Sequence, residues 1–365
     1  MTTTVAPPLP VEGERAGKRL PPLRTSLTAA AVVVIVVLLV LQRAQLVGAV
    51  AALRHLKWWW VGLALGLEAT SMAAVARLQR RMLRATGTRI PLTSALGITY
   101  AGNAISVSLP LAGPEVGTLF AYRQFQRRGA TQVTAAWVVL VSGVISSLAF
   151  TVVVIGGALA STSPAAATAG LVGGLTSVLA LLVGILAVRV NAVFCFLDRL
   201  AVRVLTLVQR VVRRPAGDPR ELVTLARDEV SLLHLRKSSW ATVVMFALIN
   251  WLADAGCLAA AVKAAGLPLP GRSIVLIWSA GAVTTTLNLT PGGLGVVEAA
   301  LIAGLVAVGL PTAGSTTAVL TYRLVSFWLV LAVGWMAYPV VQRRGARARG
   351  APVEEPAAAS TLSTG

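Results

Sequence analysis

Long apolar segments, separated by short polar or basic connections, form the main pattern along this chain of 365 residues. A helix needs about 20 apolar residues to cross the hydrocarbon core of a bilayer, and several segments reach that length. The pattern predicts six membrane-spanning helices, at about 27–41, 58–76, 133–159, 170–188, 240–262 and 319–341. The first is short enough for a signal-peptide core. No small-x-small cleavage site follows it promptly, so it is predicted to be an uncleaved span.

Two further apolar segments, 91–109 and 273–289, run into stretches rich in proline and glycine. The first stretch is Leu109–Gly117, and the second is Pro291–Gly295, which reads Pro-Gly-Gly-Leu-Gly. Proline removes a backbone donor and glycine weakens a helix, while hydrocarbon offers no water to the freed backbone groups. Each break must therefore be covered by protein or face a polar cavity. We predict two hairpins that enter the membrane, turn at the break and return. A surface loop between two ordinary spans is the alternative.

The predicted elements fall into two sets with the same order of span, span, broken hairpin and span. The halves cover about 27–160 and 168–341, and the second contains a basic cytoplasmic loop at 189–238. Polar residues repeat at corresponding positions: Glu68 with Asp254, Glu115 with Glu298, and Asn103 with Asn288. The predicted fold is an all-α polytopic membrane protein of two inverted repeats, each with three transmembrane helices and one re-entrant broken hairpin.

Composition agrees with a membrane protein, since hydrophobic residues make up 56% of the chain, charged residues 12%, and mean hydropathy is +0.79. The formal net charge of +19 does not predict nucleic-acid binding, because Lys and Arg lie between the apolar segments, as in cytoplasmic loops that face anionic lipid. The two cysteines and two histidines are not clustered, so no metal or other cofactor is predicted. We expect a multi-pass protein of the bacterial inner membrane with cytoplasmic termini and disordered tails at 1–24 and 342–365.

The second break lies in a stretch that resembles a known family motif. Leu289–Leu301 is similar to the Pro-Gly-Gly-x-Gly-x-x-Glu-Ala motif of the lysylphosphatidylglycerol synthase transmembrane family. Asn103–Gly129 resembles the first motif of that family, and Tyr322–Trp328 resembles its last span. The resemblance implies one flippase-like transmembrane domain at 25–341. Members often carry Arg directly before the second acid, where this chain has Val297.

The sequence also departs from the family pattern at Pro114, an extra proline in the first motif, and no aminoacyl-transferase domain follows the spans. The resemblance therefore implies a translocase, not an enzyme, that moves an anionic or aminoacylated phospholipid or a lipid-linked precursor between leaflets. Its expected partners are the membrane and anionic phospholipids or lipid-linked phosphate, and a homo-oligomer is left open. The alternatives are a membrane-embedded lipid-modifying transferase subunit and a scaffold for envelope synthesis.

The candidate residues of a lipid head-group and translocation path lie at the two breaks and among the acids and arginines near them. They are Glu298, Glu115, Asp254, Glu68, Arg323, Asn288, Asn103, Pro291, Gly292, Gly293, Gly295, Pro110, Gly113 and Arg123. Helices that restart after each break would direct backbone N–H groups at a phosphate, and glycine would allow its close approach. Arg323 is a candidate to pair with phosphate, and the acids are candidates to pair with an amine or to carry protons.

Each assignment has a structural alternative. Glu298 and Glu115 would stabilise helix N-termini as caps. Asp254 and Glu68 would pair with Arg or Asn inside the bundle. The two asparagines would satisfy backbone groups freed at the breaks. Arg323 would extend to the outer surface if it lies near the end of a span.

Overall fold

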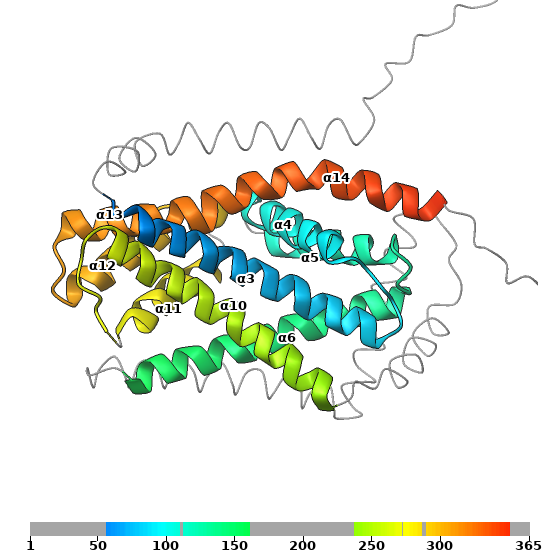
Figure 1. Ribbon diagram of the computed structural model, residues 1–365, viewed down its shortest axis with the longest axis horizontal. Coiled ribbons are helices and arrows are strands. Elements are labelled where there is room, and N and C mark those ends of the chain that lie inside the picture. Colours follow the sequence, from blue (N-terminus) through cyan, green and yellow to red (C-terminus); the bar gives the residue numbers. More distant parts are fainter. Residues whose placement is uncertain (1–55, 110–111, 161–236, 272, 287–289, 351–365) are drawn as a thin grey trace, which may run out of the picture. The chain divides into compact units, whose positions relative to one another are not determined.

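Helices joined by short turns make up the described part of the chain, in which no strand occurs (Figure 1). The computed structural model describes residues 56–109, 112–160, 237–271, 273–286 and 290–350. The predicted spans at 27–41 and 170–188 lie outside these ranges, as do the tail at 1–24 and all but the last residues of the loop at 189–238.

Four helices in the described ranges are long and apolar enough to cross a membrane. They are α3 (Trp58–Ala85), α6 (Gln132–Ala160), α10 (Lys237–Ala264) and the continuous helix formed by α13 (Thr312–Arg323), η3 (Leu324–Leu329) and α14 (Val330–Gly350). At 1.5 Å per residue, each exceeds the hydrocarbon thickness of about 30 Å. These helices correspond to four of the predicted spans.

Helices α3 and α10 pack side by side (Figure 1). Small side chains at their contact, including Ala64 and Ala261, are fully buried and let the two backbones approach closely. Across the same contact, Ser71 Oγ donates a hydrogen bond of 3.0 Å to Asn250 Oδ1. The two helices form a central pair on which the broken segments are built.

The first broken segment folds into a hairpin of α4 (Leu92–Ser108) and α5 (Gly113–Gln126). Glycine permits the close contact between them. A Cβ at Gly113 would lie 1.9 Å from the carbonyl oxygen of Ser106, and a Cβ at Gly117 would lie 2.6 Å from that of Gly102. Larger residues at Gly113 or Gly117 would separate the two helices.

The second broken segment is a hairpin of α11 (Ser273–Thr286), the single turn η2 (Pro291–Gly293) and α12 (Val296–Ala307). Its helices again meet at glycines. A Cβ at Gly281 would lie 2.7 Å from the Leu301 side chain, and a Cβ at Gly304 would lie 3.0 Å from that of Ile277. Both predicted breaks are therefore places where one helix ends and the chain folds back.

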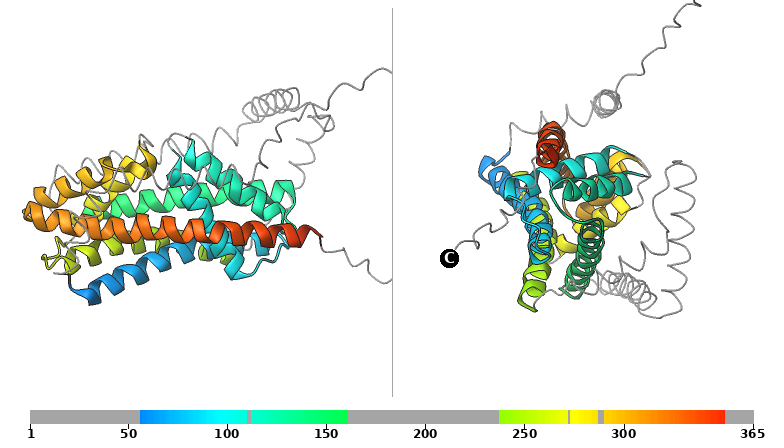
Figure 2. Two further views of the ribbon diagram at one scale, coloured as in Figure 1. Left: turned by 90° about the horizontal axis from the view of Figure 1, so that it is seen from above. Right: turned by 90° about the vertical axis from the view of Figure 1, so that its right-hand side faces the viewer.

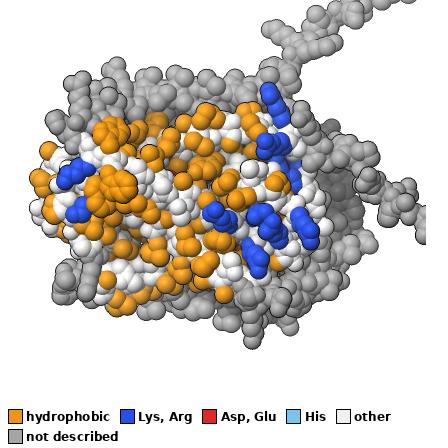
Figure 3. Space-filling model, viewed as in Figure 1, with side chains coloured by type: hydrophobic (Ala, Val, Ile, Leu, Met, Phe, Trp, Pro, Cys, Tyr) orange, Lys and Arg blue, Asp and Glu red, His pale blue; other side chains and the backbone are white. Residues whose placement is uncertain are grey.

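The base of the first hairpin lies beside the C-terminal ends of α3 and α14. Arg80 Nε donates to the carbonyl oxygen of Ile90, just before α4, at 2.9 Å. Arg128 Nη2, just after α5, donates to the carbonyl oxygen of Val341 at 3.1 Å. Figure 3 shows that most of the visible Lys and Arg side chains gather toward this end, while hydrophobic side chains cover much of the remaining described surface.

The base of the second hairpin lies at the other end of the bundle. Val275 of α11 packs against Gly157 near the C-terminus of α6. The loop residue Leu267, after α10, packs against Gly314 at the start of α13. The left view in Figure 2, like Figure 1, places α11 and α12 toward one end of the bundle and α4 and α5 toward the other.

The helices also continue beyond the segments that hydropathy marked. α3 runs to Ala85, so the arginines at 77, 80, 81 and 84 lie on a helix and not in a connection between two spans. The last span begins at Thr312, not near Val319, and its helix continues to Gly350, past the predicted end at 341. Hydropathy marks where a helix meets hydrocarbon, whereas Arg favours helix and extends it past that boundary.

Candidate functional site

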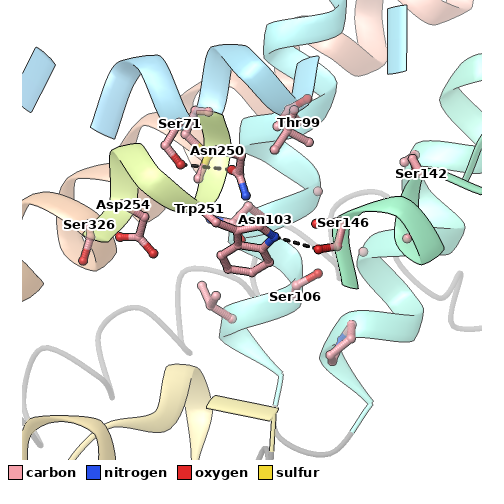
Figure 4. Close-up of a pocket in the computed structure, with 18 of the residues that line it drawn as sticks. Ser71, Thr99, Asn103, Ser106, Ser142, Ser146, Asn250, Trp251, Asp254 and Ser326 are labelled. Atoms are coloured by element: carbon pink, nitrogen blue, oxygen red, sulfur yellow. Dashed lines mark hydrogen bonds between the residues drawn. The ribbon is translucent and has the colours of Figure 1, made fainter. Parts of the chain in front are cut away.

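A cavity of about 620 Å³ lies among α3, the first hairpin, α6, α10 and η3, and residues next to the second break also line it. Its hydroxyl and amide side chains include Ser71, Thr99, Asn103, Ser106, Ser142 and Asn250 (Figure 4). Helix α4 also contacts the η2 turn. In hydrocarbon, polar groups need partners from the protein or from water in a cavity. Both broken segments therefore meet at one cavity that is lined by polar and apolar side chains.

Two tryptophans help to hold the spans around the cavity. Trp251 Nε1 of α10 donates a 2.8 Å hydrogen bond to the carbonyl oxygen of Ser146 on α6 (Figure 4). Trp251, Trp278 and Phe150 form an aromatic cluster, with ring centroids 5.0–5.8 Å apart. This packing joins α10, α11 and α6 and gives the cavity a fixed wall.

Asp254 lines the cavity from α10 and is held by two neutral donors. Tyr322 Oη donates to Oδ1 at 2.8 Å, and Trp278 Nε1 donates to Oδ2 at 3.1 Å. Each carboxylate oxygen thus accepts one hydrogen bond. The structural alternative in which Asp254 pairs with Arg or Asn is wrong as regards hydrogen bonding. An aromatic side chain, and not Arg or Asn, donates the hydrogen bond to each carboxylate oxygen.

Glu68 lines the same cavity from α3, which packs against α10. The residue is 4% exposed, and its Oε2 has no hydrogen-bond partner among the described residues. A buried carboxyl oxygen without a partner is costly unless the group is neutral or a ligand reaches it. The two corresponding acids of the predicted repeat thus face one cavity in different hydrogen-bonding environments.

Arg323 and Glu298 form a buried ion pair next to the cavity, with Arg323 Nε 2.7 Å from Glu298 Oε1. Arg323 Nη2 also donates to the carbonyl oxygen of Gly292 at 2.8 Å. Glu298 Oε2 accepts a 2.6 Å hydrogen bond from the backbone N–H of Gly295, which closes a cap on α12. The cap alternative for Glu298 is therefore confirmed. The surface alternative for Arg323 is wrong, because the helix begins well before it and buries it.

Gly292 has a geometry that only glycine fits. Its φ is +60°, and a Cβ there would lie 2.0 Å from Cε2 of Phe327. The Phe327 ring also lies under the Arg323 guanidinium, whose central carbon is 4.4 Å from the ring centroid. The π-helical segment that carries Phe327 begins directly after Arg323, and such segments often occur at functional sites.

The structure brings together five of the predicted residues at the cavity. They are Glu68, Asn103, Asp254, Gly292 and Arg323. Asn103 makes no side-chain hydrogen bond to another described residue. Its amide therefore does not satisfy a backbone group of the described residues, which was the structural alternative for this residue. Glu298 lies behind Arg323, away from the lining.

The remaining predicted residues shape the turns or lie elsewhere. Pro291, Gly293, Gly295 and Gly113 form the turns themselves. Glu115 and Arg123 are exposed on α5 and do not line the cavity. Pro110 and Asn288 lie outside the described residues.

Helical periodicity explains why Glu115 and Arg123 are absent from the cavity. The cavity face of α5 is formed by Pro114, Gly117, Thr118 and Ala121, which follow the spacing of one helix face. Glu115 follows Pro114 by one residue and therefore points to another face. The analogy with Glu298 matched the order of residues along the chain but not their phase around the helix.

Sequence reasoning missed several polar residues of the cavity. Tyr322 was recognised only as part of a motif, although its hydroxyl bonds Asp254. Ser142 and Ser146 lie four residues apart on α6, and Asn250 lies four residues before the predicted Asp254 on α10. This spacing on apolar spans places each pair on one helix face and could have identified them. Among the described residues, no group of three or more His, Cys, Asp or Glu could hold a metal ion.

Comparison with known proteins adds one relationship. The model of the family described as lysylphosphatidylglycerol synthase TM region matches residues 26–334. The match covers both hairpins, the first three described spans in full, and the fourth as far as Gly334 in the first part of α14. A search of curated proteins finds no match.

Proposed function

The chain belongs to the lysylphosphatidylglycerol synthase TM region family, and from this premise we propose that it is a lipid translocase. It moves an anionic or aminoacylated phospholipid, or a lipid-linked precursor, between the two leaflets. Family membership ties the protein to membranes and lipid metabolism. The single observation that carries the finer proposal is a cavity that contains acids, an arginine, amides and hydroxyl groups and is lined by residues from both broken hairpins.

The proposed architecture is an inverted repeat with re-entrant hairpins. Three relationships support it: α3 and α10 run antiparallel in the central pair, the hairpins have their bases at opposite ends, and each hairpin follows one of these helices. The backbone N–H of Lys57, before α3, donates to the carbonyl oxygen of Ala264 at the end of α10, at 3.0 Å. Alternating access around a fixed central site follows from such symmetry.

The proposed orientation places the arginine-rich end of the bundle in the cytoplasm. The C-terminal parts of α3 and α14 carry arginines, and basic residues favour the cytoplasmic side of a bacterial inner membrane. The first hairpin then enters from the cytoplasm and the second from outside. Both termini are cytoplasmic in this proposal.

The cavity chemistry suits a head group that contains phosphate. Phosphate is expensive to carry through hydrocarbon, so its path needs donors and positive charge. Arg323 lines the cavity with two of its nitrogens engaged, while Nη1 donates to no described residue. That nitrogen is the proposed phosphate contact. Among the lining hydroxyl groups, those of Ser106, Ser146 and Ser326 donate to no described residue and supply further donors. The acyl chains remain in the bilayer. No covalent step is involved.

A vesicle experiment tests the proposal. The full-length protein is reconstituted into phosphatidylcholine–phosphatidylglycerol vesicles that contain a trace of fluorescent phosphatidylglycerol, and an impermeant quencher reports the outer leaflet. We expect inner-leaflet label to become quenchable at a rate proportional to protein content. Protein-free vesicles give the background. No movement of phosphatidylglycerol, cardiolipin or lysylphosphatidylglycerol above that background would contradict the proposal.

A further inference from the structure

The described lining of the cavity carries more negative than positive groups. Glu68 and Asp254 are its acids, and Arg323 is its only Lys or Arg. Glu298 already neutralises Arg323 through the buried ion pair. If all four groups are ionised, two negative charges remain uncompensated. This imbalance opposes entry of a phosphate, which the proposed function requires.

The two lining acids differ in how the protein supports a charge on them. Asp254 accepts one hydrogen bond at each oxygen, as suits an ionised carboxylate. Glu68 has an unpartnered Oε2 in a buried position, and no Lys or Arg forms an ion pair with it among the described residues. When two neighbouring acids have environments this different, one can stay ionised while the other takes up a proton.

The groups that face Glu68 come from each element packed around it. Asp254 and Cys257 approach from α10, Tyr100 from α4 and Tyr322 from α13. None of these supplies a positive charge. In the described lining of the cavity, Arg323 is the one Lys or Arg, and Glu298 already pairs with it. As far as the described residues go, a proton is therefore the compensation available for the negative charge of Glu68.

We propose that Glu68 is a proton-carrying site that couples lipid movement to proton movement, a proposal that rests on the translocase function. Glu68 takes a proton from water on the side to which the cavity opens. The neutral carboxyl then leaves one uncompensated negative charge in place of two, so a phosphate head group enters with less repulsion. On the opposite side the O–H bond breaks, the proton passes to water and the head group leaves. Proton and anionic head group travel in the same direction.

The main test uses wild-type vesicles with a pH gradient and clamped membrane potential. Labelled phosphatidylglycerol should accumulate in the leaflet on the alkaline side. Glu68→Gln keeps the size and neutrality of the protonated side chain but carries no titratable proton, so whatever lipid movement the variant retains should not respond to the pH gradient. Glu115→Gln makes the same chemical change on exposed α5 and should respond as wild type does.

The outcomes separate the two proposals. Wild-type movement that ignores the pH gradient, or follows only a sodium gradient, overturns the proton site and leaves the translocase proposal standing. Retained gradient dependence in Glu68→Gln also overturns it. Absence of any lipid movement contradicts the translocase itself.

A second measurement needs no variant. A hydrophobic carbodiimide reacts with protonated carboxyl groups in apolar surroundings, and mass spectrometry of the wild-type protein locates the adduct. We expect labelling at Glu68, with less at Asp254, and loss of labelling as pH is raised. Wild-type protein in which Glu68 stays unlabelled while Asp254 reacts would overturn the assignment.

Discussion

Arg323 and Glu298 connect the last span to the second hairpin through a buried ion pair of 2.7 Å. The same guanidinium binds the carbonyl oxygen of Gly292, and the same carboxylate accepts the N–H of Gly295. The pair therefore fixes both sides of the break between η2 and α12. It also places Arg323 at the cavity wall, so the geometry of the turn and the charge of the proposed path depend on each other.

We expect Arg323→Met to destabilise the protein by about 3–5 kcal/mol, because it leaves the Glu298 charge buried without its partner. Glu298→Gln in the same background removes that charge and should recover part of the loss. Denaturant unfolding of purified protein in detergent measures each change. Arg123→Met, on an exposed site of α5, is the control and should stay within about 0.5 kcal/mol of wild type. Equal losses in the single and double variants would show that the ion pair is unimportant.

Gly292→Ala should destabilise the second turn. Its positive φ alone costs an L-residue about 1–2 kcal/mol, and the new methyl group meets the Phe327 ring. Gly62→Ala is the matched control, because nothing lies within 4 Å of a Cβ there. In a helix interior that control should gain up to about 1 kcal/mol. Thermal unfolding compares the two variants. If Gly292→Ala unfolds at the same temperature as wild type, the described turn is contradicted.

Tyr322→Phe removes the hydroxyl that donates to Asp254 and leaves the ring in place. A hydrogen bond to a charged acceptor contributes about 1.5–3 kcal/mol, so we expect a loss of that size in unfolding free energy. Tyr100→Phe is the control, since the Tyr100 hydroxyl bonds no described residue. If both changes have equal effects, Asp254 is not held as described.

Asn103→Leu separates transport from stability. Asn103 lines the cavity but makes no side-chain hydrogen bond to a described residue, so its loss should change unfolding free energy by less than about 1 kcal/mol. Lipid movement should fall, because the path loses a polar group. Asn250→Leu should reduce stability as well, since it breaks the bond from Ser71. Normal lipid movement by a folded Asn103→Leu protein would place the path elsewhere.

Much of the fold was predictable because the membrane constrains it strongly. Apolar length located the four described spans, and Pro-Gly stretches located both breaks, since each freed backbone group needs a partner. Hydropathy could not locate the ends of the helices, because α3 continues through several arginines beyond its apolar part. The position of Arg323 was misplaced for the same reason, because threonines and small residues before it continue the helix.

The site was predictable in outline only. Isolated acids on apolar spans drew attention to Glu68 and Asp254, and both of these residues line the cavity. Chain order alone could not show that Glu115 points away from it, because that depends on the phase of α5. The pairing of Glu298 with Arg323 could not be derived from spacing, since it joins two elements through tertiary packing.

The central claim is that a lipid head group enters the cavity between the two hairpins. Photo-crosslinking from a diazirine on the head group of phosphatidylglycerol, followed by peptide mapping, tests it directly in reconstituted vesicles. The account predicts adducts on cavity residues of both broken segments, such as Asn103 and Thr285, together with Phe327 of η3. Adducts confined to outward-facing residues, such as Leu140, Leu252 and Met336, would contradict it.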